Sequence, residues 1–194
     1  SDAQTTYNFN TEHTWPQSLF SSQEPMLSDL HHLFPVDENA NSTRSNNPFG
    51  MVANPSWQQG GSKSAGGVFE PRDVHKARAA RALFYVAIRY QNYNNFLNSQ
   101  EKILKEWNAL YAPTKMDSAR NEAIYKLQKN RNPFIDNPNY VNQIWGSSSA
   151  SGGTSTPPSS SGCGNETFET IPAESSASYL TRTWTNNGIT WTAT

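Results

Sequence analysis

The chain of 194 residues carries 15 Lys and Arg against 16 Asp and Glu, and 35% of it is hydrophobic. This is enough for one ordinary domain with additional polar segments. No run of about 18 apolar residues occurs, which excludes a membrane-spanning helix, and the single cysteine, Cys163, excludes a disulfide or a cysteine-ligated metal in the main domain.

The first 70 residues predict two short strands, a short helix and long loops. Residues 7–16 alternate loosely and indicate a strand that ends at Pro16, and His31–Val36 is a second short extended run. Glu38–Asn46 is rich in capping residues and predicts a short helix. Two polar stretches indicate loops, residues 17–28 and 47–69.

Helical periodicity dominates the next part of the chain. Apolar residues at helical spacing predict one helix over about residues 71–90 and another over about residues 100–111. A third helix starts near Ser118, capped by that residue or by Asp117. A short fourth helix is expected over residues 137–145, with an Asn-Pro pair as its cap and first position.

The last 48 residues differ in composition from the rest. Residues 1–146 are interpreted as one domain, and residues 147–162 as a flexible linker of Ser, Gly and Pro. Tyr179–Thr194 is rich in Thr and Trp around an Asn-Asn-Gly turn, which predicts a β-hairpin. A lone hairpin is marginal in water, so residues 163–194 are interpreted as the start of a β domain that the given chain truncates.

Metal-assisted hydrolysis of a phosphodiester is one interpretation of the polar residues near the N-terminus. Three of the four histidines fall there, among acids and amides: Glu12, His13, Asp29, His31, His32, Asn39, Asn41 and Arg44. A neutral imidazole can take a proton from water near pH 7. Glu and Asn oxygens suit a hard cation such as Mg²⁺.

Each of these residues also has a structural interpretation. Adjacent Glu and His are common by chance, His31 and His32 on a short apolar run are typical of structural residues, and Asn41 in a capping-rich segment is typical of a helix cap. A structural zinc site is disfavoured because the histidines lack the spacing of zinc ligands.

Four blocks of the chain, in order, give the sequence a resemblance to the bacterial endonuclease I family of nonspecific DNases. The blocks are NTEHTWPQS (Asn10–Ser18), SDLHHLFPVDENANSTRSNNPFG (Ser28–Gly50), FEPRDVHKARAARALFYVAIRY (Phe69–Tyr90) and RNEAIYKLQKNRNPFIDNPNYVNQIWG (Arg120–Gly146). The resemblance implies an α+β fold in which several helices pack around a ββα-metal core, also called a His-Me finger.

The resemblance also implies roles for individual residues. His13 corresponds to the general base, and Glu12 and Asn41 correspond to the ligands of one Mg²⁺ ion, with Mn²⁺ or Ca²⁺ as alternatives. The Glu-His pair is expected where the first strand ends. The loop between residues 14 and 28 lacks the Arg or Lys that some members place there, so Arg44 and Arg131 are the candidates for stabilising phosphate charge.

Charge is distributed unevenly in a way that suits a nucleic-acid partner. Residues 1–62 carry a net charge of −5, residues 63–131 carry +7 and residues 132–194 carry −3. A basic middle can hold phosphates near a metal site, although a solvated basic helix face explains it equally well. The expected phosphate contacts are Arg72, Lys76, Arg78, Arg81, Lys129 and Arg131.

Two functions of different class remain open from the sequence. The first is a bacterial metal-dependent endonuclease, secreted or periplasmic, that hydrolyses DNA or RNA with little sequence preference. The second is a secreted non-catalytic binding or surface-attachment protein that retains the nuclease fold, which the linker and the β segment motivate. The sequence does not indicate an oligomeric state.

Overall fold

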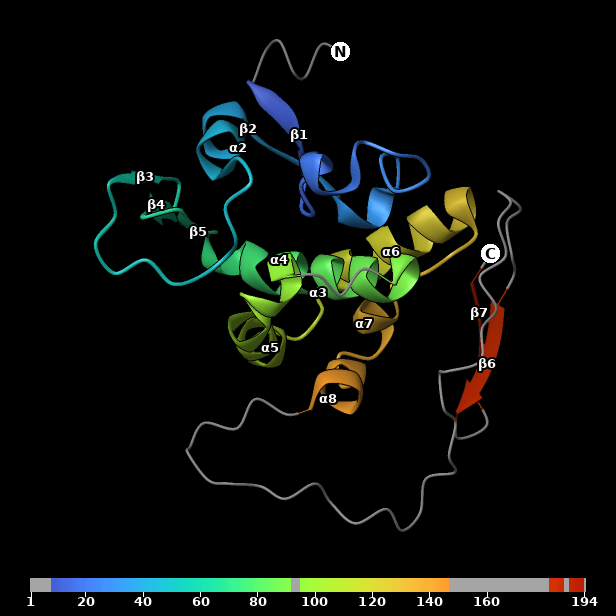
Figure 1. Cartoon of the computed structure of the whole chain (residues 1–194). Coiled ribbons are helices and arrows are strands. Elements are labelled where there is room, and N and C mark those ends of the chain that lie inside the picture. Colours follow the sequence, from blue (N-terminus) through green and yellow to red (C-terminus); the bar gives the residue numbers. More distant parts are fainter. Residues whose placement is uncertain (1–7, 92–94, 147–181, 187–188, 194) are drawn as a thin grey trace. The chain divides into compact units, whose positions relative to one another are not determined.

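The computed structural model describes residues 8–91, 95–146, 182–186 and 189–193. The chain divides into two compact units, Ser1–Ser148 and Ser149–Thr194. The first unit combines helices with two small antiparallel sheets, so the described fold is α+β (Figure 1). Within the described residues, no helix has both the length and the apolar character that crossing a membrane requires.

A two-stranded sheet and a short helix form the N-terminal part of the first unit. Strand β1 (Phe9–His13) pairs antiparallel with β2 (Leu33–Asp37), and helix α2 (Glu38–Arg44) follows β2 directly. The side chain of Asp37 caps α2 by accepting a hydrogen bond from the Ala40 amide at 3.0 Å. Figure 1 shows β1, β2 and α2 together at one end of the unit.

The chain between β1 and β2 is more structured than the sequence predicts. It contains two 3₁₀ helices, η1 (Gln17–Phe20) and η2 (Leu30–His32). His31 and His32 therefore lie in η2 and not on the predicted second strand. The reason is local, because the Asp29 side chain caps η2 by accepting a hydrogen bond from the His31 amide at 3.0 Å.

The predicted loop over residues 47–69 is wrong for its second half, which forms a three-stranded antiparallel sheet. Its strands, in sheet order, are β3 (Trp57–Gln59), β4 (Ser62–Ala65) and β5 (Val68–Glu70). Two Gly-Gly pairs make the turns, and all four glycines have positive φ, from 56° to 86°. Paired positive φ values suit tight two-residue hairpin turns, which glycine adopts without strain.

Six helices complete the described part of the first unit, and the three predicted long helices are confirmed. The helices are α3 (Asp73–Tyr90), α4 (Asn95–Asn98), α5 (Glu101–Leu110), α6 (Lys115–Gln128), α7 (Pro133–Asp136) and α8 (Tyr140–Trp145). The start of α6 differs from prediction because Thr114 and Asp117 form a reciprocal capping box there. Helices α4 and α7 have a single turn each and were not expected from periodicity.

The core is built around α3. Its residues from Ala79 to Ala87 are all buried, so this helix is covered on every side. Figure 1 shows α3 crossing the middle of the unit, and it contacts η2, α5 and α7. Alanines on α3 let these neighbours approach closely, and an aromatic group of Phe84, Phe134 and Trp145 fills the space toward α8.

In the second unit, β6 (Arg182–Asn186) pairs antiparallel with β7 (Ile189–Ala193). This pairing confirms the predicted hairpin for those residues. The predicted linker, residues 147–162, and Cys163 lie outside the described residues, so the interpretation of residues 163–194 as a truncated β domain stays a prediction.

Candidate active site

A cavity of about 200 Å³ lies between the end of β1, the start of η1 and helix α2. It brings together Glu12, His13, Asn41 and Arg44, which the sequence analysis assigns to one site. The lining residues are Thr11, Glu12, His13, Pro16, Gln17, Ser18, Asn41, Ser42, Arg44, Ser45 and Asn46. Polar side chains dominate this lining, which suits a charged or strongly hydrated ligand.

Glu12 and His13 line the same cavity although successive residues of a strand point to opposite faces. Strand β1 ends at His13, and Pro16 precedes the first residue of η1. Glu12 is 7% exposed, whereas His13 is half-buried. The pair thus lies where regular alternation stops, so neither side chain is constrained by a continuing strand.

A buried ion pair joins α2 to the end of β1. Arg44 Nη1 lies 2.8 Å from Glu12 Oε1, and the guanidinium also donates to the His13 carbonyl at 3.1 Å and to the Thr14 carbonyl at 2.6 Å. The guanidinium also lies over the rings of Phe49 and Phe96, whose centroids are 4.7 and 6.0 Å away. Burial raises the pKa of Glu12 to about 7, and the charge of Arg44 opposes that shift.

The hydrogen bonds of His13 define which ring nitrogen is basic. Nε2 lies 2.9 Å from the Leu27 carbonyl oxygen. A carbonyl can only accept, so the neutral imidazole carries its proton on Nε2. Nδ1 therefore keeps its lone pair, and it lies 3.0 Å from the amide nitrogen of Gln17, another residue of the cavity lining. This nitrogen is the one that can accept a proton.

Asn41 extends from the middle of α2 into the same lining. Its amide nitrogen donates to the Thr11 carbonyl at 3.3 Å. This bond leaves the amide oxygen as the atom of Asn41 that can bind a cation. Asn41 is therefore not a cap of α2, because Asp37 has that role.

The oxygen donors fit a cation that keeps part of its hydration shell. Among the described residues, no group of three or more His, Cys, Asp and Glu side chains could hold a metal ion. Glu12 and Asn41 nevertheless supply one carboxylate and one amide oxygen to a single cavity. Mg²⁺ is often bound by one or two carboxylates and several waters, so such a small donor set is sufficient.

Asp29 anchors the segment before β2 to the helical core. Its carboxylate accepts hydrogen bonds from Tyr85 at 2.6 Å, Tyr90 at 2.8 Å and Gln128 at 3.0 Å. Burial raises the pKa of Asp29, but the bonds from Tyr85, Gln128 and the His31 amide outweigh it and lower the pKa below its usual value. This network is not visible in the sequence, because Tyr85, Tyr90 and Gln128 lie 56 to 99 residues from Asp29.

His31 and His32 are held as neutral structural groups. His31 Nε2 donates to the Asn130 carbonyl at 3.1 Å, and His32 Nε2 donates to the Met26 carbonyl at 2.6 Å. Burial lowers the pKa of both, that of His32 to about 4. The His32 ring meets the His13 ring edge-on, with centroids 5.6 Å apart. The structural interpretation of these two histidines therefore has direct support.

The sequence profile of the family described as Endonuclease I matches residues 1–139. The chain belongs to the endonuclease I family. The matched region contains the cavity, the Asp29 network and all of α3, α5 and α6. Membership thus covers the residues that build the candidate site.

Three relatives show what this endonuclease I chain is similar to. The extracellular ribonuclease of Bacillus subtilis (strain 168) is 34% identical over 156 residues, which cover 71% of this chain and 54% of that protein. Endonuclease-1 of Buchnera aphidicola subsp. Baizongia pistaciae is 30% identical over 114 residues, or 56% and 46% of the two chains. An extracellular deoxyribonuclease of Aeromonas hydrophila is 31% identical over 117 residues, or 57% and 50%. The chain spans about half the length of these relatives.

Three of the cations expected to contact phosphates have internal partners in this endonuclease I domain. Lys76 is 6% exposed and bonds Glu70 and Asp73, each at 2.7 Å. Arg81 is 1% exposed and donates to Asn108 at 2.9 Å. As a separate pair, Arg78 lies 2.5 Å from Asp117 of the α6 capping box. Burial and pairing argue against phosphate contacts by Lys76, Arg78 and Arg81.

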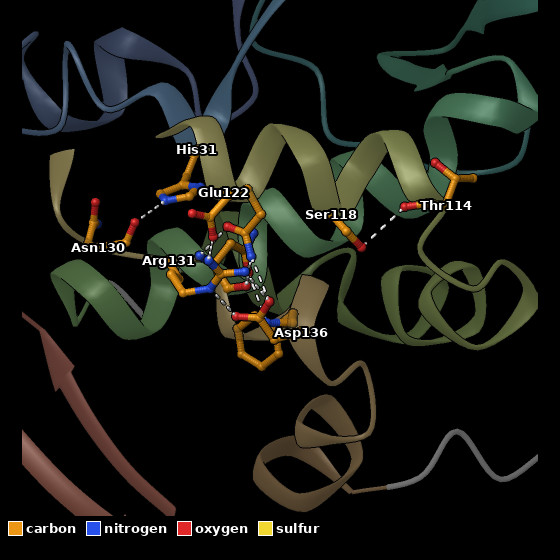
Figure 2. A network of polar contacts seen from close by, with 10 residues as sticks. His31, Thr114, Ser118, Glu122, Asn130, Arg131 and Asp136 are labelled. Atoms are coloured by element: carbon orange, nitrogen blue, oxygen red, sulfur yellow. Dashed lines mark hydrogen bonds and ion pairs between the residues drawn. The ribbon is translucent and has the colours of Figure 1, made fainter. Parts of the chain in front are cut away.

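The other expected phosphate contacts lie nearer to solvent. Arg72 is exposed, and Lys129 Nζ donates to the Lys126 carbonyl at 2.9 Å. Arg131 is bound on two sides, by Glu122 at 2.6 Å and Asp136 at 2.8 Å (Figure 2). These carboxylates raise the pKa of Arg131 and balance its charge locally. Arg72 and Lys129 are therefore the two of these residues whose charge is not balanced by a carboxylate among the described residues.

Proposed function

We propose that this chain is a metal-dependent endonuclease that hydrolyses phosphodiester bonds in DNA or RNA with little sequence preference. In this proposal β1, β2 and α2 are the ββα-metal, or His-Me finger, core. The observation that carries it is the single cavity lined by an oriented imidazole, a carboxylate and an amide, His13, Glu12 and Asn41. The names of the relatives, which include ribonucleases and deoxyribonucleases, support both substrate classes.

The proposed chemistry begins with proton transfer to His13. Its Nδ1 takes a proton from water, the water oxygen forms a bond to phosphorus, and the bond from phosphorus to the leaving oxygen breaks. Glu12 and Asn41 hold Mg²⁺, and Mn²⁺ or Ca²⁺ can use the same oxygen donors. When bound, the ion stabilises negative charge on the phosphate and on the leaving oxygen.

Two arginines take supporting parts in this proposal. Arg44 positions the Glu12 carboxylate and the end of β1 through the contacts described above. Arg131, with 34% of its side chain exposed, and exposed Arg72 are the candidates for phosphate contacts. Contacts of this kind go to the nucleic-acid backbone, which accounts for low sequence preference.

The extracellular and periplasmic names of the relatives support secretion from a bacterial cell. In such a location the substrate is nucleic acid outside the cytoplasm. The second unit, with its β6–β7 hairpin, is proposed as a separate β domain joined by the linker. Its contribution to substrate binding is tested by comparing nucleic-acid cleavage by the chain with and without residues 149–194.

A plasmid assay tests the proposed function. Supercoiled DNA and a folded RNA are incubated with the chain in Mg²⁺ or in EDTA, beside His13→Ala and the loop control Gln23→Ala. We expect cleavage that requires the cation, and a loss of about 10²- to 10⁴-fold in His13→Ala, the usual worth of a positioned base. Circular dichroism checks that the variant is folded.

Unchanged cleavage by folded His13→Ala would show that another group is the base. Tight nucleic-acid binding by the unmodified chain without any cleavage would instead favour the non-catalytic binding protein. Comparing rates on DNA and RNA of equal length separates the two substrate classes.

A further inference from the structure

The first residue of η1 makes a contact that the proposed chemistry leaves unused. Gln17 lines the cavity, and its amide nitrogen lies 3.0 Å from His13 Nδ1. Because Nε2 of His13 carries the proton, Nδ1 can only accept, so the Gln17 amide must present its nitrogen to the ring. The carboxamide therefore occupies the place next to Nδ1 that an attacking water needs.

The Gln17 side chain is held from its other end as well. Its oxygen, Oε1, accepts a hydrogen bond from the Ser22 hydroxyl at 3.4 Å. Its backbone carbonyl accepts from the Ser22 amide at 3.0 Å, across a turn in which Ser21 and Ser22 have positive φ of 55° and 52°. The turn thus holds Ser22 beside Gln17, which fixes the carboxamide with its nitrogen toward His13.

We propose that Gln17 is a positioning residue for the general base. Before substrate binds, its amide keeps His13 in the Nε2–H form with the Nδ1 lone pair directed at the cavity. When substrate binds, a water replaces the amide at Nδ1 and gives its proton to that nitrogen. This inference rests on the proposed function, because it assigns Gln17 a task only if His13 is the base.

Two substitutions of Gln17 separate positioning from a general effect on the loop. Gln17→Ala removes the amide that orients the ring before the water arrives. We expect the kcat on plasmid to fall about fivefold to tenfold with KM unchanged, because a misdirected ring then occurs in part of the bound enzyme. Gln17→Glu keeps the shape but offers only an acceptor, which favours a proton on Nδ1. We expect the kcat of Gln17→Glu to fall about 10²-fold, the lower end of what a base contributes.

The matched controls are Gln23→Ala and Gln23→Glu. Gln23 is exposed and lies in the same segment between β1 and β2 as Gln17, and its amide donates to the Ser21 carbonyl at 3.0 Å. Substituting Gln23 therefore makes the same changes of charge without altering a contact to His13. We expect both controls to keep kcat within about twofold of the unmodified chain, as surface substitutions usually do.

Nitrogen NMR of the His13 ring gives a readout that needs no activity. In the unmodified chain without substrate or cation, we expect the proton on Nε2 and a bare Nδ1, and in Gln17→Glu a proton on Nδ1. Equal kcat for Gln17→Glu and Gln23→Glu, or an unchanged ring in Gln17→Glu, would overturn the proposal. Full activity in folded His13→Ala would instead show that His13 is not the base. That result contradicts the proposed function itself and is distinct from a failure of the Gln17 proposal alone.

Discussion

Arg44 is the side chain on which the charge balance of the cavity depends. It comes from the last turn of α2, is 2% exposed, and makes three polar contacts, all to Glu12 or to the end of β1. A buried ion pair is weak evidence for stability, but removing one partner leaves the other charge without compensation. The pair therefore specifies how α2 meets β1.

A double-mutant cycle on Glu12 and Arg44 tests this role. We expect Arg44→Met to lower the unfolding free energy by about 3–5 kcal/mol, because Glu12 is left buried without its partner. The double variant with Glu12→Gln should recover about half of that loss or more, since no charge remains unpaired. Urea denaturation measures the stabilities, with Lys126→Ala as a surface control.

Recovery of stability should not bring back cleavage, because Glu12→Gln also removes a proposed cation ligand. An additive double variant, as unstable as the sum of the single variants, would contradict the view that these two charges compensate each other.

At the scale of elements, α2 is the part that brings Asn41 to the cavity. Its register depends on the Asp37 cap, whose carboxylate accepts from the Ala40 amide at 3.0 Å. α6 has a comparable start, because Thr114 accepts from the Asp117 amide at 3.2 Å. In both caps a side-chain oxygen accepts a hydrogen bond from an amide of the first turn, but only the first cap belongs to a helix that lines the cavity.

The pair of caps gives a matched prediction. Asp37→Ala and Thr114→Ala should each lower the unfolding free energy by about 1 kcal/mol, the usual cost of losing a helix cap. Asp37→Ala should also weaken Mg²⁺ binding several-fold, because fraying of the first turn of α2 moves Asn41. Calorimetric titration of both variants checks this, and equal Mg²⁺ affinity would show that α2 keeps its place without the cap.

Elements with strong periodicity were predictable from the sequence, and those defined by distant contacts were not. The apolar repeats of α3 and α5 predict these helices because tertiary packing reinforces a local signal. The sheet of β3–β5 differs from the predicted loop because its strands are short and polar, and its local signal is limited to the Gly-Gly pairs at residues 60–61 and 66–67. The start of α6 differs because it is set by a Thr-x-x-Asp capping box, which apolar periodicity does not show.

The candidate site likewise has some residues that local sequence indicates and others that only distant contacts define. Adjacent Glu12 and His13 before a proline are visible in the sequence, and the structure places both at the cavity with Asn41. The roles of Lys76 and Arg81 were less predictable, because periodicity shows that residues share a face but not that their charges are buried. Asp29 could be placed in the network only after α3 and α6 were located in space.

At the scale of the whole molecule, the Asp29 network joins the site to the helical core. Asp29 and Leu30 are bound by Gln128, and His31 by Asn130, across 98 or 99 residues of sequence. Burial favours the uncharged form of the neighbouring imidazoles, and hydrogen bonds favour the charged form of Asp29. The stability of the first unit should therefore depend on pH.

The sign of the pH dependence follows from His32. Its pKa is about 4 in the folded protein against an ordinary 6.5, so only the unfolded chain takes up this proton between these values. The contribution of neutral His32 to the free energy of unfolding is full above pH 6.5. It is lost as the pH falls to about 4, a change on the order of 2–3 kcal/mol. The difference in unfolding free energy between the unmodified chain and His32→Gln, measured by urea denaturation at several pH values, should show this decline.

At still lower pH, protonation of Asp29 causes a second loss of stability. Its folded pKa lies below the ordinary 3.8, so its stabilisation is present above that value and disappears as the pH falls through the folded pKa. Glu12, whose pKa is raised to about 7, has the opposite effect over this range, so the test is the comparison with His32→Gln. An identical pH dependence of stability in the unmodified chain and in His32→Gln would contradict the burial of neutral His32.

The long sequence separation in the Asp29 network has a consequence for synthesis of the chain. The ribosome makes β1, with Glu12 and His13, early, but the groups that hold the segment before β2, Gln128 and Asn130, emerge about a hundred residues later. A nascent or truncated chain that stops before them lacks the bonds that anchor η2. Nuclease competence would thus arrive only near the end of translation of this unit, which spares the nucleic acids of the producing cell while the chain is unfinished.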